Sequence, residues 1–304
     1  MRIRLVHNPG AGSEDHRQEE IVHWLRQAGH QVRAGLVGEF LRAPSSSRDA
    51  DLVLVAGGDG TVRKVALALL GQEIPLGILP LGTANNLARS LGLDQPVRAL
   101  IQGLASFVRR GFDVGVASGP WGERFFLEGF GVGFFSDYLA ALNQPGIAQW
   151  AEDLREEQGM LRDYIFLPQL LAGYASRGWE LCVDGAALSG DYFLVETLNT
   201  TSVGPFDGLA GRADAGDGSL DLVTLGDGEI QTFCDVLTSR AEGDAQPFPF
   251  PVRRFRELEL RCRDEYLHFD GDFWPDARAH AEPSVVWVSV RPSALTVLCP
   301  QIGI

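Results

Sequence analysis

The sequence contains few cysteines and no long apolar run. Its four cysteines lie far apart and form no CxxC pair, so we interpret each as a small core residue rather than a metal ligand or half of a disulfide. No stretch approaches the ~18 apolar residues of a membrane span. The apolar run in the first twelve residues is too short for a signal peptide. We therefore expect a cytoplasmic protein.

Basic residues are outnumbered by acidic ones, which gives a formal net charge of -14. This excess makes general nucleic-acid binding a poor prediction and means that any contact with an anionic lipid surface must be local. With 304 residues, 45% of them hydrophobic, the chain is long enough for two domains, each with its own core.

The most informative stretch follows a short apolar run. Residues Leu52–Ala56 are typical of a strand that is buried on both faces. Gly57-Gly58-Asp59-Gly60-Thr61 comes next, and apolar residues at helical spacing follow it. A glycine turn between a strand and a helix suits phosphate, because the helix N-terminus offers free N–H groups. A tight turn without a ligand is the alternative. Asp59 argues against it, since a carboxylate in a phosphate site implies an intervening cation such as Mg²⁺.

Two further glycine loops follow predicted strands in the first part of the chain. Asn8–Ser13 comes after the strand Ile3–Val6, with Ser13 as a candidate helix cap, and Gly82–Arg89 comes after the strand Pro75–Pro80. Strands and helices alternate throughout this part. The pattern predicts an α/β domain with a mostly parallel sheet, with glycine loops at the strand ends.

The character of the sequence changes near residue 112. The stretch Trp179–Leu188, with Asp184-Gly185 inside it, predicts a hairpin, and Leu258–Arg263 alternates as a half-buried antiparallel strand does. Ser284–Val290 and Ala294–Leu298 are predicted to be two further strands, and residues 147–175 to be partly helical. We expect an α/β nucleotide-binding domain at 1–112 and an antiparallel β-sandwich domain at 113–291. Residues 292–304 are a candidate segment for return to the first domain.

Two motifs resemble those of a known family. Gly57–Thr61 resembles the nucleotide-binding signature of the superfamily of diacylglycerol, sphingosine and NAD kinases. Gly82-Thr83-Ala84-Asn85-Asn86-Leu87-Ala88-Arg89 resembles the G-T-x-N-[DN]-x-A-R run of bacterial diacylglycerol-kinase-like lipid kinases. The resemblance implies an ATP-dependent lipid kinase that uses Mg²⁺. The implied nucleotide-binding residues are Asn8, Gly57, Gly58, Asp59, Gly60, Thr61, Gly82, Thr83 and Asn85, and Asp59 has a catalytic role through Mg²⁺.

Two acidic segments extend the resemblance, although each is also typical of a simple hairpin turn. Asp217-Gly218-Ser219-Leu220-Asp221 is similar to the segment that holds a structural Mg²⁺ in the family, which implies Asp217, Ser219 and Asp221 as ligands. Phe269-Asp270-Gly271-Asp272 stands where the family has D-G-E. The resemblance implies Asp272 as the general base, with Asp270 as the alternate. The chain departs from the family at Asp272, which is shorter than Glu, and also at Gly216 and at Arg63-Lys64.

Two other functions are compatible with these motifs. One is a NAD-kinase-like enzyme acting on a soluble nucleotide, and the other is a non-catalytic lipid- or nucleotide-binding relative. We expect ATP and a lipid as partners, transient contact with the inner membrane surface and no nucleic acid, and we leave a homodimer open. Gln246–Phe255 is interpreted as a loop entering a strand, with a local lipid contact as the alternative.

Overall fold

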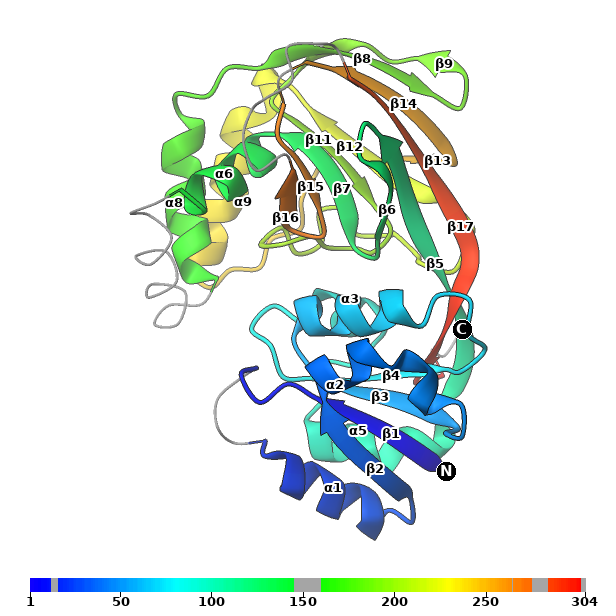
Figure 1. Cartoon of the computed structure of the whole chain (residues 1–304). Helices are drawn as coiled ribbons and strands as arrows, with labels where there is room; N and C mark the ends of the chain where they lie inside the picture. The colour runs from blue at the N-terminus through cyan, green and yellow to red at the C-terminus, as the bar shows by residue number, and fades with distance from the viewer. Residues whose placement is uncertain (12–15, 145–159, 264, 275–283, 302–304) are drawn as a thin grey trace. The chain divides into compact units, whose positions relative to one another are not determined.

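The computed structural model describes residues 1–11, 16–144, 160–263, 265–274 and 284–301 (Figure 1). The chain divides into two compact units. The first is Met1–Val114 together with the segment that begins at Pro292, and the second is Gly115–Arg291. The predicted loop residue Ser13 and much of the predicted helical stretch 147–175 lie outside the described residues.

A parallel sheet forms the centre of the first unit. Its strand order is β4-β3-β1-β2, and every neighbouring pair is parallel. Every residue of β3 is buried, as its continuous apolar sequence predicts for a central strand with helices on both faces. The bounds are β1 (Arg2–His7), β2 (Gln31–Leu36), β3 (Leu52–Gly57) and β4 (Leu76–Pro80).

Helices cover both faces of this sheet (Figure 1). One face is covered by α1 (Gln18–Gln27) and α5 (Val97–Gly103), and the other by α2 (Val37–Arg42), α3 (Asp59–Ala68) and α4 (Asn86–Ser90). Two 3-10 turns, η1 (Pro44–Ser47) and η2 (Leu104–Ser106), lie in the connections. The helix α1 begins after a segment outside the described residues and buries Ile21 and Leu25.

A single long strand, β17 (Ser284–Cys299), replaces the two strands predicted near the C-terminus. Its first part pairs antiparallel with β14 (Glu257–Cys262), and Val297 pairs parallel with Leu76 of β4. Ser293 has φ 48° directly after Pro292. A proline and a left-handed residue interrupt the apolar pattern, although the hydrogen bonding continues past them. The prediction of two strands was therefore wrong.

Two antiparallel sheets form the second unit. One is the β10-β8-β14-β17 part of the larger sheet, with β5, β6 and β9 attached to it, and the other has the order β13-β12-β11-β7-β15-β16. The predicted hairpin is confirmed, because β8 and β9 pair antiparallel across Asp184 and Gly185, which both have positive φ. The remaining bounds are β5 (Val108–Gly119), β6 (Gly122–Phe126), β7 (Gly129–Gly133), β8 (Arg177–Val183), β9 (Ala186–Ala187), β10 (Gly190–Tyr192), β11 (Leu194–Leu198), β12 (Leu220–Leu225), β13 (Arg253–Phe255), β15 (Leu267–Phe269) and β16 (Asp272–Trp274).

The two sheets of this unit share one core. Alternate residues of β8, β14 and β17 pack with Phe130, Val195 and Phe269 from the six-stranded sheet. This is the predicted β-sandwich, and the predicted fold class of an α/β domain plus an antiparallel sandwich is confirmed.

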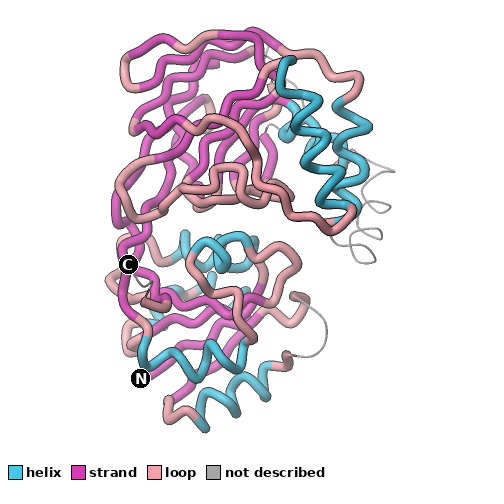
Figure 2. Tube along the Cα trace, turned by 180° about the vertical axis from the view of Figure 1, so that it is seen from behind, coloured by secondary structure: helices cyan, strands magenta, loops and turns pink. Residues whose placement is uncertain are grey.

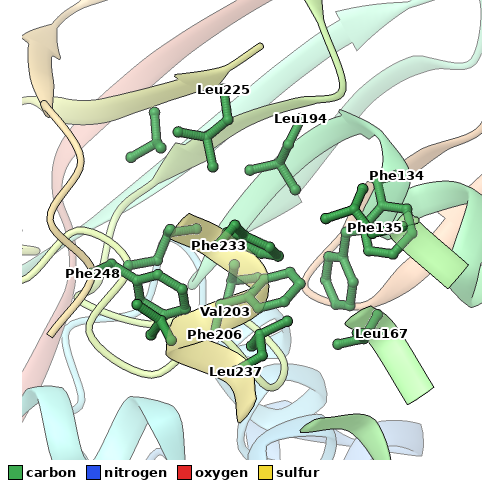
Figure 3. Close-up of a cluster of buried hydrophobic side chains, with 14 of the residues drawn as sticks. Phe134, Phe135, Leu167, Leu194, Val203, Phe206, Leu225, Phe233, Leu237 and Phe248 are labelled. Atoms are coloured by element: carbon green, nitrogen blue, oxygen red, sulfur yellow. The ribbon is translucent and has the colours of Figure 1, made fainter. Parts of the chain in front are cut away.

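A second core lies on the other face of the six-stranded sheet, where the helices of this unit gather (Figure 2). Phe135, Phe206 and Phe233 meet there in edge-on contacts with centroid distances of 4.7 and 5.3 Å (Figure 3). The loop segment Gln246–Phe255 supplies Phe248 to this cluster, which supports its interpretation as a loop entering a strand. The helical elements are α6 (Phe134–Leu142), α8 (Leu161–Leu171), η3 (Asp227–Glu229) and α9 (Ile230–Ala241).

Candidate active site

Three loops of the first unit meet at one edge of its parallel sheet. The strands β4, β3 and β1 are neighbours with aligned carboxyl ends: Gly57 pairs with Pro80, and Ala56 with His7. The loops that begin at Asn8, Gly58 and Leu81 therefore start side by side. The helix α3 begins at Asp59 within the second loop, and its first N–H groups have no partner inside the helix. This edge is where open α/β sheets bind ligands.

The second and third loops touch through their backbones at two glycines. A Cβ on Gly82 would lie 2.6 Å from the Cα of Gly58, and one on Gly58 would lie 3.1 Å from the Cα of Gly82. Leu81 N–H donates to the Gly57 carbonyl at 3.1 Å and holds the loops at this separation. The glycines at 58 and 82 are therefore required by the close approach of two main chains.

Gly82→Ala should lower the thermal stability of the protein, because the new Cβ must push the two backbones apart. Overpacking of this kind costs about 1–3 kcal/mol. The matched control is Gly60→Ala, since a Cβ at Gly60 meets nothing within 4 Å and alanine favours the helix there. Thermal unfolding of the two variants checks this, and equal melting temperatures would contradict the backbone contact.

Two asparagines fix the loops. Asn8 donates from Nδ2 to Thr61 Oγ1 at 2.8 Å, while its Oδ1 accepts from Gly10 N–H at 3.1 Å. Asn85 has φ 51° and binds both backbone groups of Gly82, with Oδ1 accepting from N–H at 2.9 Å and Nδ2 donating to the carbonyl at 2.6 Å. Asn8 thus ties the first loop to the second, and Asn85 shapes the third loop internally.

Asp59 connects the second loop to the third. Its Oδ1 accepts from the Leu87 N–H at 3.1 Å, so the carboxylate stands at the N-terminus of α4. Burial raises the pKa of Asp59, and the N–H groups of Leu87, Asn86 and Asn85 oppose that shift. Thr83 and Gly60 are exposed residues of the two loops that Asp59 connects. Backbone donors, a threonine hydroxyl and one half-buried carboxylate are the groups that a polyphosphate with its cation would meet here.

In the second unit, Asp270 is bound to the main chain. Its carboxylate accepts from three successive N–H groups, those of Leu127, Glu128 and Gly129, at 2.8–3.1 Å. Asp270 itself has φ 51° and Gly271 has φ 84°, so the turn between β15 and β16 is left-handed at both positions. Three backbone N–H groups therefore hold the Asp270 carboxylate in place.

Asp272 differs from Asp270 in that it is exposed at the start of β16. It pairs with Phe269 across the turn that Asp270 anchors.

Sequence reasoning missed Asn199, which is 1% exposed and donates from Nδ2 to the Leu127 carbonyl at 2.9 Å. Asn199 therefore supports the same segment that binds Asp270. No pattern in the sequence indicated this, because the partners are 72 residues apart.

In the segment predicted to hold a structural Mg²⁺, Asp217 forms an ion pair with an arginine. Arg254 Nη2 lies 2.9 Å from Asp217 Oδ2, and Asp217 Oδ1 accepts from the Ser219 N–H at 2.9 Å. Arg254 also pairs across the sheet with Asp221. Burial raises the pKa of Asp221, and the charge of Arg254 opposes this shift. No group of three or more His, Cys, Asp or Glu suited to a metal occurs within the described residues. Arg254 thus places a positive charge beside Asp217 and Asp221, and the role of these residues as Mg²⁺ ligands stays a prediction.

Comparison with known proteins shows what the chain is similar to. Residues 2–117 match the diacylglycerol kinase catalytic domain, the region that contains all three loops. The first unit of the chain therefore resembles the diacylglycerol kinase catalytic domain. It is 27% identical over 253 residues to a diacylglycerol kinase of Bacillus subtilis, covering 80% of each chain. It is 28% identical over 292 residues to that of Mycobacterium tuberculosis, covering 95% of this chain and 87% of the relative. The resemblance to bacterial diacylglycerol kinases is confirmed.

Solved structures of the diacylglycerol kinase type share the fold. A putative diacylglycerol kinase of Bacillus anthracis aligns with a TM-score of 0.73 at 19% identity, over 99% of this chain and 95% of that one. A second structure from that organism gives 0.71 at 18% identity, with 99% of each chain covered. In the part of this chain that the structure describes, none of the helices has the length and apolar character needed to cross a bilayer.

Proposed function

We propose that this protein is an ATP-dependent lipid kinase that transfers the γ-phosphoryl group to a lipid hydroxyl such as that of diacylglycerol. The observation that carries the proposal is the group of three loops at one sheet edge, within a region that matches the diacylglycerol kinase catalytic domain. ATP binds at this edge. The N–H groups of Gly57–Thr61 and the Thr83 hydroxyl contact its phosphates, and Asn8, Gly82 and Asn85 hold the loops in the shape that receives them.

The cation in this proposal enters with the nucleotide, as the Mg²⁺ of MgATP. Asp59 supplies the negative charge that accompanies it, at the start of α4 and beside the exposed loop residues. Phosphoryl transfer requires positioning and neutralisation of charge more than covalent participation by the protein. The main contribution of the loops is therefore to fix the phosphates and their counterion.

Asp272 accepts the proton of the lipid hydroxyl as that oxygen attacks the γ-phosphorus. Its exposure supports this role, whereas the three backbone N–H donors to Asp270 support an architectural role for that residue. Asp270 fixes the turn from which Asp272 extends. We therefore assign Asp272 as the base and Asp270 as its positioning residue.

Apolar side chains on α8 support a lipid as the acceptor. Leu161, Ile165 and Leu170 are 41%, 41% and 51% exposed on this helix. Leu161 and Ile165 are four residues apart and therefore neighbours on the helix surface. Exposed apolar neighbours of this kind favour contact with a lipid surface over contact with a soluble nucleotide. This apolar surface belongs to a strongly acidic chain, so we propose transient contact with the membrane rather than stable adsorption.

Incubation of the full chain with γ-labelled ATP, Mg²⁺ and diacylglycerol in detergent micelles should yield labelled phosphatidate. Parallel reactions with NAD and without acceptor serve as controls. Label on the lipid is the expected result. Label on NAD instead would assign the enzyme to soluble nucleotides, and no transfer to either acceptor would overturn the kinase proposal.

A further inference from the structure

Three arginines face one pocket in the first unit. The pocket has a volume of about 230 Å³ and is lined by residues of β1, β2 and the segment around η1, among them Arg2, Arg4 and Arg33. Arg2 begins β1 and pairs with Gln31, which begins β2. The pocket therefore lies toward the amino ends of these strands. The glycine loops follow the carboxyl ends, so the pocket is separate from the candidate active site.

The strand register explains why the arginines gather. In adjacent parallel strands the residues at paired positions point to the same face, and so do residues two apart in one strand. Arg4 pairs with Arg33, and Arg2 lies two residues before Arg4. The helix α2 and the turn η1 lie on this face. Like charges side by side on a sheet are unfavourable without a counterion.

Two of these positive charges differ in how they are balanced. Arg2 is paired with Asp51 at 2.7 Å, and the hydrogen bond from Arg2 lowers the pKa of Asp51 to about 2. Arg4 is 6% exposed, and its Nε has no hydrogen-bond partner among the described residues. Burial, followed by the charge of Arg33, lowers the pKa of Arg4, and Glu39 opposes this shift. Arg4 also donates from Nη1 to the Ala34 carbonyl at 3.3 Å, so the guanidinium is only partly paired within the protein, which is costly for a buried cation.

We propose that this pocket binds a phosphate-bearing anion between the guanidinium groups of Arg4 and Arg33. The planar fork of arginine matches the oxygens of phosphate. Gln31 and Ser46 also line the pocket and add neutral hydrogen-bond donors. Acidic groups modulate the site: Asp49 lines it, Asp51 is held by Arg2, and Glu39 lies near Arg4. Asp49 opposes a second negative charge on the ligand, so its removal tightens binding.

Calorimetric titration of the full chain with inorganic phosphate tests the proposal, and a separate titration with glycerol 3-phosphate distinguishes the free ion from an esterified head group. Arg33 is exposed, so Arg33→Ala leaves the fold intact. It should weaken binding about tenfold, as expected for loss of a charge-assisted pair. Asp49→Asn should tighten binding about threefold. Arg98→Ala, at another exposed arginine of this unit, is the matched control and should bind as the wild type does.

The two variants also separate this pocket from the glycine loops. Phosphate bound at the glycine loops would be unaffected by changes at Arg33 and Asp49. Equal affinities of wild type, Arg33→Ala and Asp49→Asn would therefore overturn the proposal, whatever the outcome of the kinase assay. In NMR spectra, the Arg4 Nε–H resonance should shift on titration with phosphate. A resonance that stays fixed up to saturating phosphate would argue that the arginines form an internal network only.

Discussion

Asp272→Asn should reduce the rate of lipid phosphorylation by about 10²–10⁴-fold, the range for loss of a general base. The substitution preserves size and removes only the ability to take a proton. Because Asp272 is exposed, the free energy of unfolding should change little. Initial rates with saturating ATP and diacylglycerol, together with a thermal unfolding curve, measure both quantities. The exposed Glu180, altered to Gln, is the matched control and should keep full activity.

Asp270→Ala should lower the stability of the protein more than the activity of the molecules that remain folded. It removes the acceptor of three backbone N–H groups. Each buried donor left without a partner costs about 1–3 kcal/mol, so we expect a loss of about 3 kcal/mol or more in stability. Any loss of activity would then follow the loss of folded protein. A stable Asp270→Ala variant without activity, combined with an active Asp272→Asn variant, would reassign the base to Asp270.

Asp59→Asn should lower transfer by about 10²-fold or more, the magnitude for removal of one preorganised electrostatic group, while keeping the fold. Asparagine retains an oxygen that accepts from the Leu87 N–H but lacks the charge that accompanies MgATP. Asp59→Ala removes both the charge and the cap, and loss of a cap costs about 1 kcal/mol of stability. Comparison of the two variants separates the charge from the hydrogen bond. Near-wild-type turnover in Asp59→Asn would refute the role of the charge.

The pKa of Asp59 gives this comparison a pH dependence. Burial raises the pKa of Asp59 above the ordinary value of an aspartate, so the folded state holds the proton more tightly than the unfolded state. The stability contributed by this group is fully present below the ordinary pKa of an aspartate and is lost as the pH rises through the higher folded pKa. Asp59→Asn should therefore match the wild type at low pH and equal or exceed its melting temperature at neutral pH. Thermal unfolding across this range provides the test.

The sequence predicted the parts of the fold that depend on local pattern. A continuous apolar run such as β3 has few alternatives to a central strand, and Asp184-Gly185 has few alternatives to a hairpin turn. The helix α9 was missed, although Phe233, Val236 and Leu237 fall at helical spacing. In β17, Pro292 and Ser293 resembled a strand boundary, yet the ladder on either side belongs to one strand. Local signals therefore found many of the elements, but they missed α9 and did not show that β17 continues through Pro292.

The sequence predicted some parts of the candidate site but not the contacts between distant segments. The glycine loops could be found because each follows a strand directly, and parallel strands bring their carboxyl ends to one edge. The contact between Gly58 and Gly82 and the capping of α4 by Asp59 join separate segments, and no spacing reveals them. The roles of Asp270 and Arg254 also depend on distant partners: Asp270 binds backbone groups more than 140 residues earlier, and Arg254 meets Asp217.

The pairing of Val297 with Leu76 has a consequence for how the protein emerges from the ribosome. The strand β4 is made early, but the part of its neighbour β17 that pairs with it is synthesised only after the whole second unit. Until then the nascent nucleotide-binding unit has an unpaired strand edge, the type of surface that recruits other chains. Synthesis of the segment that follows the second unit, rather than of the first hundred residues, is therefore the step that completes this sheet and ends its exposure to aggregation.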